Sequence, residues 1–258
     1  MKMDLFQQIL LFLISTIANT FSAYAGGGAG LLQLPALIFL GLPFAVALAT
    51  HKIASVALGI GAAIRHSKEK KLHWKFALFI LVTGVAGVIP GASFILTVPE
   101  VYANLALGFM TVGLAIYSWL RSDMGLDAKN IHRDTGGYLI GGTVLLIIGI
   151  LNGSLTSGTG LFCTLWLVRW FGLDYKLAIA YTLVVVGIFW NGTGAITLAL
   201  LGTVKWSWLP ALILGSAIGG YLGAHLAIKS HNNSIKRAFE LVTLITGLAL
   251  IVKSLTAG

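Results

Sequence analysis

The stretch Ala25-Gly26-Gly27-Gly28-Ala29-Gly30, followed by Leu31-Leu32-Gln33-Leu34-Pro35, interrupts a long apolar region. Glycine costs about 1 kcal/mol per helical residue relative to alanine, so a helix is expected to end here. Irregular backbone at membrane depth persists only where it is buried in protein or lines a cavity. A similar interruption, Thr156-Ser157-Gly158-Thr159-Gly160-Leu161, follows about 130 residues later. Paired breaks in corresponding places of two halves point to the binding site of a secondary transporter.

The composition places this chain in a membrane. It has 258 residues, of which 57% are hydrophobic and 10% are charged, and its mean hydropathy is +0.93. Soluble domains carry about 25% charged residues. We therefore expect a single transmembrane domain over residues 1–258. The one cysteine, Cys163, excludes an internal disulfide and a cysteine-rich metal site.

Apolar stretches predict an all-α polytopic membrane protein with eight full transmembrane helices and two half-helices. The stretches cover residues 5–25, 31–40, 44–64, 76–96, 101–120, 138–156, 161–171, 177–201, 208–228 and 238–255. A helix needs about 20 residues to cross the hydrocarbon core. Residues 31–40 and 161–171 are too short, since at about 1.5 Å per residue each reaches only half-way. Residues 1–25 also resemble a signal peptide, but their length suits a span and the second half contains a counterpart.

The two halves of the chain resemble each other. Gly28-Ala29-Gly30-Leu31 matches Gly158-Thr159-Gly160-Leu161, and Gly41-Leu42-Pro43 matches Gly172-Leu173-Asp174. We interpret residues 1–121 as a first repeat, 122–137 as a connecting loop and 138–258 as a second repeat. Each repeat has about five segments: one full helix, one half-helix and three more helices.

The loop charges predict that the second repeat is inverted. With an odd number of crossings per repeat, one side of the membrane receives Arg65, Lys68, Lys70, Lys71, Lys75, Arg121, Lys129, Arg133, Arg169, Lys176, Lys229, Lys236 and Arg237. The other side receives Lys2, Lys205 and Lys253, and Lys52 lies within the membrane. Cytoplasmic loops are enriched in Lys and Arg. We therefore expect a multi-pass protein of the bacterial inner membrane with a cytoplasmic 122–137 loop and periplasmic termini. The net charge of +9 then reflects topology, and we expect no nucleic-acid partner.

The starts of the half-helices are candidate anion sites. Unpaired backbone N–H groups and the helix macrodipole together attract anions without a charged side chain. The candidates are Gly27, Gly28 and Gly30 in the first break and Ser157, Gly158, Thr159 and Gly160 in the second. Glycines also allow helices to pack closely. We favour that packing role for Gly84, Gly87, Gly91, Gly215, Gly219 and Gly223, and a binding site for the two breaks.

Further polar residues are candidates for the site. A lysine within an apolar run, such as Lys52, usually faces a cavity or pathway. Lys52 could neutralise an anion, and its neighbour His51 could carry a coupling proton. The alternative is that Lys52 extends to the membrane surface, although it lies about 13 Å past Pro43 at helical rise. Thr50 and Gln33 complete the first-half candidates. Asn191 and Asn152 either line the cavity or bond between helices, and both interpretations stay open.

Enzymatic function is not indicated. The sequence contains no metal-binding cluster, P-loop, Ser-His-Asp arrangement or paired carboxylates. We therefore expect neither catalysis nor a cofactor, and no pumping powered by ATP bound to this chain.

The motifs together resemble a known family. They are Gly26-Gly27-Gly28-Ala29-Gly30-Leu31-Leu32-Gln33-Leu34-Pro35, Ala49-Thr50-His51-Lys52-Ile53-Ala54-Ser55, and Ser157–Leu161 with Val204-Lys205-Trp206. The chain is similar to the sulfite exporter TauE/SafE family, in which Asn commonly stands at the position of His51. The resemblance implies a secondary transporter of small sulfur-containing or organic anions such as sulfite, thiosulfate or sulfonates.

Two classes of transport follow from these features. We expect alternating access around an anion held between the half-helices, and the alternative is an anion channel of the same architecture. The expected partners are a small anionic solute and the lipid bilayer. Proton coupling and assembly into a homo-oligomer stay open.

Overall fold

The computed structural model describes residues 5–26, 30, 32–67, 72–97, 99–120, 128–129, 131–156 and 158–256. These residues form helices and no strands. The helices of the first half are α1 (Leu5–Ala25), α2 (Gln33–Phe39), α3 (Phe44–His66), α4 (Trp74–Phe94), η3 (Ile95–Thr97) and α5 (Glu100–Leu120). Those of the second half are α6 (Thr135–Ser154), α7 (Thr159–Phe171), α8 (Tyr175–Tyr181), η4 (Thr182–Trp190), α9 (Asn191–Leu201), η5 (Trp206–Trp208), α10 (Leu209–Lys229) and α11 (Asn232–Thr256).

The helix lengths suit a multi-pass membrane protein. Seven helical segments of the described chain are long and apolar enough to cross a membrane, with α8, η4 and α9 forming one of them. Helix α5, with 21 residues, is long enough to be an eighth membrane-spanning helix. The two stretches expected to be half-helices are short: α2 has 7 residues and α7 has 13. At about 1.5 Å per residue neither crosses a core of about 30 Å.

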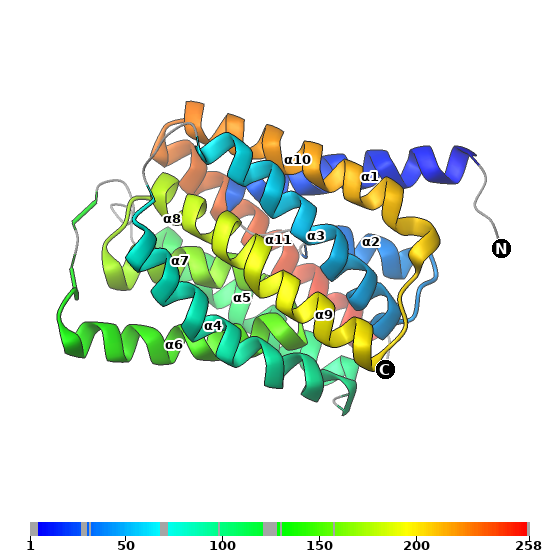
Figure 1. Ribbon diagram of the computed structural model, residues 1–258, viewed down its shortest axis with the longest axis horizontal. Coiled ribbons are helices and arrows are strands. Elements are labelled where there is room, and N and C mark those ends of the chain that lie inside the picture. Colours follow the sequence, from blue (N-terminus) through cyan, green and yellow to red (C-terminus); the bar gives the residue numbers. More distant parts are fainter. Residues whose placement is uncertain are drawn as a thin grey trace.

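The helices pack in pairs that join the two halves of the chain (Figure 1). Helix α1 packs along α10, and α6 packs along α4. Helix α5 packs on α11, and α3 lies between α10 and the η4–α9 segment. The start of α1 and the end of α11 lie at the same end of the molecule in Figure 1. The core is therefore built from contacts between residues far apart in the sequence.

The spaced glycines have the packing role expected of them. A Cβ on Gly215 or Gly219 of α10 would lie 2.7 Å or 2.6 Å from a backbone oxygen of α1. A Cβ on Gly87 or Gly91 of α4 would overlap the backbone of α6. Close approach of helix backbones through small residues is a common way for membrane helices to associate. The prediction of close packing at these glycines is confirmed.

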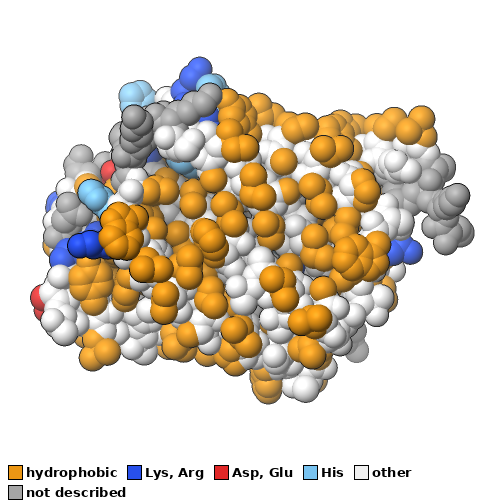
Figure 2. All heavy atoms as spheres, viewed as in Figure 1, with side chains coloured by type: hydrophobic (Ala, Val, Ile, Leu, Met, Phe, Trp, Pro, Cys, Tyr) orange, Lys and Arg blue, Asp and Glu red, His pale blue; other side chains and the backbone are white. Residues whose placement is uncertain are grey.

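The outer surface is apolar around its middle. Large hydrophobic side chains near the middles of helices, such as Val82, Ile218 and Ile245, are 57%, 44% and 54% exposed. Figure 2 shows hydrophobic side chains across the centre of one face, with Lys, Arg and His gathered mainly at the left end. Figure 1 places the start of α6 at that end. A wide apolar surface of this kind is what contact with lipid requires.

Candidate functional site

The second chain break is held in a specific conformation. Helix α6 ends at Ser154, and Thr156 adopts a left-handed backbone with φ of 58°. This conformation costs a non-glycine residue about 1–3 kcal/mol, and such strain concentrates at functional sites. The Thr159 hydroxyl donates to the backbone oxygen of Thr156 at 2.8 Å and so closes the break. Gly158, also left-handed, then begins α7.

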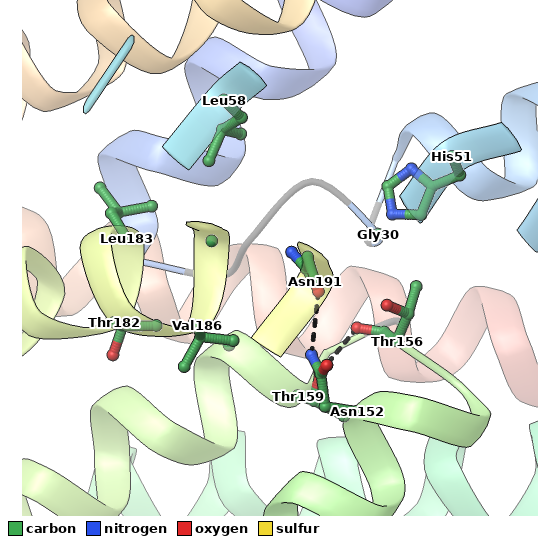
Figure 3. A pocket seen from close by; sticks show the side chains of 12 residues that line it. Gly30, His51, Leu58, Asn152, Thr156, Thr159, Thr182, Leu183, Val186 and Asn191 are labelled. Carbon is green, nitrogen blue, oxygen red and sulfur yellow. Dashed lines mark hydrogen bonds between the residues drawn. The ribbon is translucent and has the colours of Figure 1, made fainter. Parts of the chain in front are cut away.

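The two breaks meet in the interior. The Thr164 hydroxyl of α7 lies 2.9 Å from the backbone oxygen of Gly26, at the end of α1. Gly30 of the first break and Thr156, Thr159 and Gly160 of the second line the same cavity (Figure 3). The start of α7 thus lies across this cavity from Gly30, just before α2.

The cavity between the breaks is small and mostly enclosed. Its remaining wall is formed by His51 and Leu58 of α3, Asn152 of α6, and Thr182, Leu183, Val186, Gly187 and Asn191 of the η4–α9 segment. Its volume is about 10 Å³, which is about the room that one water molecule needs. An oxyanion of four or more heavy atoms therefore requires the walls to move apart.

Lys52 lies one layer behind this cavity. Its ammonium nitrogen donates to the backbone oxygen of Asn152 at 2.6 Å, to Asn152 Oδ1 at 2.8 Å and to Asn191 Oδ1 at 3.1 Å. An ammonium has three protons, so each has an acceptor. The side chain is fully buried. Lys52 therefore does not extend to the membrane surface, which excludes the alternative considered for it.

The charge of Lys52 has no carboxylate beside it in the described parts of the chain. The ion pair found there is Lys236 with Glu240, on α11. All three acceptors of Lys52 are neutral oxygens. Charged groups inside a membrane protein are usually paired or mark a substrate or ion pathway. The site therefore carries a positive potential that an anion can balance.

A π-helix places Asn191 opposite Lys52. The nine residues of η4 are wound as a π-helix, a form that is rare and frequent at functional sites. Trp190 ends it, and the indole N–H of Trp190 donates to the backbone oxygen of Ile80 at 3.2 Å. Gly84 leaves the space that the indole occupies. Asn191 follows directly, at the start of α9, and is 6% exposed.

A second polar network supports His51. His51 Nδ1 lies 2.8 Å from Gln33 Oε1, and both side chains are buried. Gln33 Nε2 donates to the Ser15 hydroxyl at 2.8 Å and to the Ser216 hydroxyl at 3.2 Å. Asn19 donates to the same Ser216 hydroxyl at 3.0 Å. Gln33 therefore links the short helix α2 to α1, α3 and α10.

The structure divides the predicted site residues into three groups. The cavity wall contains Gly30, His51, Thr159, Gly160 and Asn191. A second group lies outside the wall. In it, Lys52 and Gln33 lie behind the wall and bond to its side chains, and Gly158 is the N-cap of α7. The Thr50 hydroxyl, also in this group, accepts from the backbone N–H of Lys205 at 2.9 Å. Gly27, Gly28 and Ser157 lie outside the described residues.

The cavity wall also contains residues that the sequence did not single out. Leu58, Val186 and Gly187 are apolar or lack a side chain, and no sequence pattern distinguishes them from packing residues. For Asn152 the sequence allows either lining or bonding. It does both, because it lines the cavity and bonds to Lys52, Thr159 and Asn191. Among the residues that the structure describes, no group of His, Cys, Asp and Glu could hold a metal ion.

Comparisons with known proteins agree with this architecture. The family model "Sulfite exporter TauE/SafE" matches residues 11–250. A probable membrane transporter protein of Sinorhizobium is 27% identical, over 93% of this chain and 91% of its own. Probable membrane transporter proteins of Haemophilus influenzae and Escherichia coli (YfcA) are 25% and 24% identical, over 88% and 95% of this chain and 88% and 90% of their own. No solved structure matches the chain. Because the family model covers all but the two ends of the sequence, the chain belongs to the TauE/SafE family of membrane transporters.

Proposed function

We propose that this protein is a secondary transporter that moves a small anion across the bacterial inner membrane by alternating access. The observation that carries the proposal is the buried Lys52 ammonium, whose hydrogen-bond acceptors among the described residues are all neutral oxygens, beside a cavity where two chain breaks meet. The family name supports a sulfur-containing anion such as sulfite, and thiosulfate or sulfonates share its chemistry. These are the anions that the family resemblance implies.

The helix contacts support the inverted repeat that alternating access would use. Exchanging the two halves turns the α1–α10 pair into the α6–α4 pair and leaves the α5–α11 pair unchanged. The left-handed residues also correspond, since Gly26 and Thr156 are 130 positions apart and Gly41 and Gly172 are 131 apart. A twofold relation between the two halves would explain why the helix pairs interchange and why the left-handed residues lie at equal offsets. Rocking of one half against the other would expose the site to each side in turn.

A hollow at the basic end of the molecule supports access to the site from that side. The hollow, of about 220 Å³, is lined by His66 of α3 and by Leu177 and Ala180 of α8. Leu58 and Leu183, which line the central cavity, lie further along the same two segments. Leu58 and Leu183 are both buried. Separation of α3 from η4 would join the two spaces.

The closed cavity favours a carrier over a channel. A cavity of about 10 Å³ does not provide a continuous ion pathway. Radiolabelled sulfite flux into proteoliposomes tests the proposal, with thiosulfate and methanesulfonate as further substrates. A carrier should give flux that saturates and is accelerated by unlabelled sulfite inside. Flux equal to that of protein-free liposomes for all of these anions would overturn the proposal, and flux that never saturates and shows no counterflow would indicate a channel.

A further inference from the structure

Two side chains of the cavity wall have their polar atoms fixed from behind. Lysine only donates hydrogen bonds, so the oxygen of the Asn191 carboxamide must face Lys52, and its NH₂ group must face away. Asn152 also donates to this oxygen, at 3.3 Å. The orientation of an amide is assigned from such partners. Lys52 thus sets the direction of Asn191 without itself reaching the cavity wall.

The Asn191 NH₂ group is directed at the cavity. Its nitrogen makes no hydrogen bond to any residue that the structure describes, although the residue is only 6% exposed. Figure 3 shows this nitrogen on the side of the Asn191 side chain that faces away from Asn152. Together with the N–H groups at the start of α7, Asn191 offers an anion a set of neutral donors.

His51 presents a hydrogen-bond acceptor to the cavity, where Asn191 presents a donor. The Ser15 hydroxyl gives its one proton to the backbone oxygen of Leu212, so it accepts from Gln33 Nε2. Gln33 Oε1 therefore faces His51 and accepts the Nδ1 proton. In a neutral imidazole with its proton on Nδ1, the other nitrogen, Nε2, is an acceptor. No described residue bonds to Nε2, and His51 lines the cavity. Gln33 therefore sets the His51 tautomer as Lys52 sets the Asn191 amide.

From the Asn191 donor and the His51 acceptor together, we infer that the site selects a small oxyanion that carries its own proton, HO–X–O⁻, as in hydrogen sulfite or hydrogen carbonate. The donors of Asn191 and α7 bind the charged oxygen, and His51 Nε2 accepts the hydrogen bond of the O–H group. Lys52 and Gln33 are positioning residues. The single charge of Lys52 balances the single charge of such an anion. This inference rests on the proposed anion transport and specifies its substrate class.

Competition between two anions of equal shape tests the inference. Hydrogen carbonate and nitrate are both planar, both carry one charge, and differ in the O–H group. Each is added to wild-type proteoliposomes that take up radiolabelled sulfite, at a pH where hydrogen carbonate predominates. We expect hydrogen carbonate to inhibit at a concentration at least about tenfold lower than nitrate, the factor equivalent to about 1.4 kcal/mol. Equal inhibition by both anions would overturn the inference while leaving anion transport intact.

Variants of Gln33 separate positioning from general damage. Gln33→Leu removes the acceptor that holds the His51 proton on Nδ1, so the tenfold preference should fall towards one. Gln33→Glu keeps an oxygen acceptor at that position and should keep the preference even if total flux decreases. A preference unchanged in Gln33→Leu would overturn the role of His51. Absence of sulfite uptake in the wild type would instead contradict the proposed transport itself.

Discussion

The ammonium nitrogen of Lys52 lies 3.1 Å from the side-chain oxygen of Asn191, a residue 139 positions away. This contact joins α3 to the start of α9, and Asn152 of α6 bonds to both side chains. Three helices from both halves of the chain therefore meet at one buried charge. Any movement that separates the halves must break these hydrogen bonds, so an anion that binds here can influence which conformation is stable.

Lys52→Met should abolish anion uptake while preserving the fold. The change removes the positive charge and the donor that orients Asn191. It leaves the two Asn152 oxygens without the lysine donor, while Asn191 Oδ1 keeps the Asn152 amide. The loss costs about 1–3 kcal/mol, but the change also removes a buried charge whose desolvation is unfavourable. The two effects oppose each other, so the melting temperature in detergent should change little.

Lys75→Met provides the control, because Lys75 is exposed at the start of α4. Uptake by this variant should equal that of the wild type. Lys52→Met proteoliposomes that take up sulfite at the wild-type rate would remove Lys52 from the site.

Gly194→Ala should reduce anion uptake, because the added methyl group displaces the end of the Lys52 side chain. A Cβ at this position would lie 3.2 Å from Lys52 Cε and 3.3 Å from Nζ, so the end of the lysine side chain must shift by a few tenths of an ångström relative to its three acceptors. Gly192→Ala, two residues earlier on α9, gains the same methyl group, whose nearest neighbour is 3.9 Å away. Initial uptake rates at several sulfite concentrations should show a higher KM for Gly194→Ala only. An equal increase in KM in both variants would instead indicate an effect of helix rigidity.

Gly84→Ala should destabilise the protein. Its Cβ would overlap the Trp190 indole, which is fully buried and bonded to Ile80. Overpacking of this kind costs about 1–3 kcal/mol, and thermal unfolding in detergent should shift down by several degrees. Gly113→Ala on α5 meets nothing within 4 Å and should unfold at or above the wild-type temperature. Equal stability of the two variants would contradict the packing of Trp190 on Gly84.

The expected orientation can be tested by labelling introduced cysteines in intact cells. The variants carry Ala128→Cys, between α5 and α6, or Thr203→Cys, between α9 and α10, and both positions are exposed. Cys163 is buried, and Cys163→Ala removes it as a background. A membrane-impermeant maleimide should label the Thr203→Cys variant in intact cells and the Ala128→Cys variant only after permeabilisation. The reverse pattern would place the termini in the cytoplasm.

The sequence by itself determined the positions of the membrane helices and the two breaks. Helix α1 has the predicted bounds of residues 5–25, and α7 extends the predicted 161–171 by two residues. This success has a simple cause. In a membrane, hydrophobic length decides where a helix can cross, and clustered glycines decide where it cannot continue.

The tertiary structure alone decided which polar groups face the cavity. Lys52 and His51 are adjacent in the sequence, yet His51 lines the wall while Lys52 lies behind two asparagines. The direction of each depends on α6, α2 and the π-helical turn before Asn191, which has no recognisable pattern in the sequence. Local residues set helix boundaries. For Lys52 and Asn191, hydrogen-bond partners more than one hundred residues away set the orientation of an amide, and the packing of α2 on α3 sets the tautomer of a histidine.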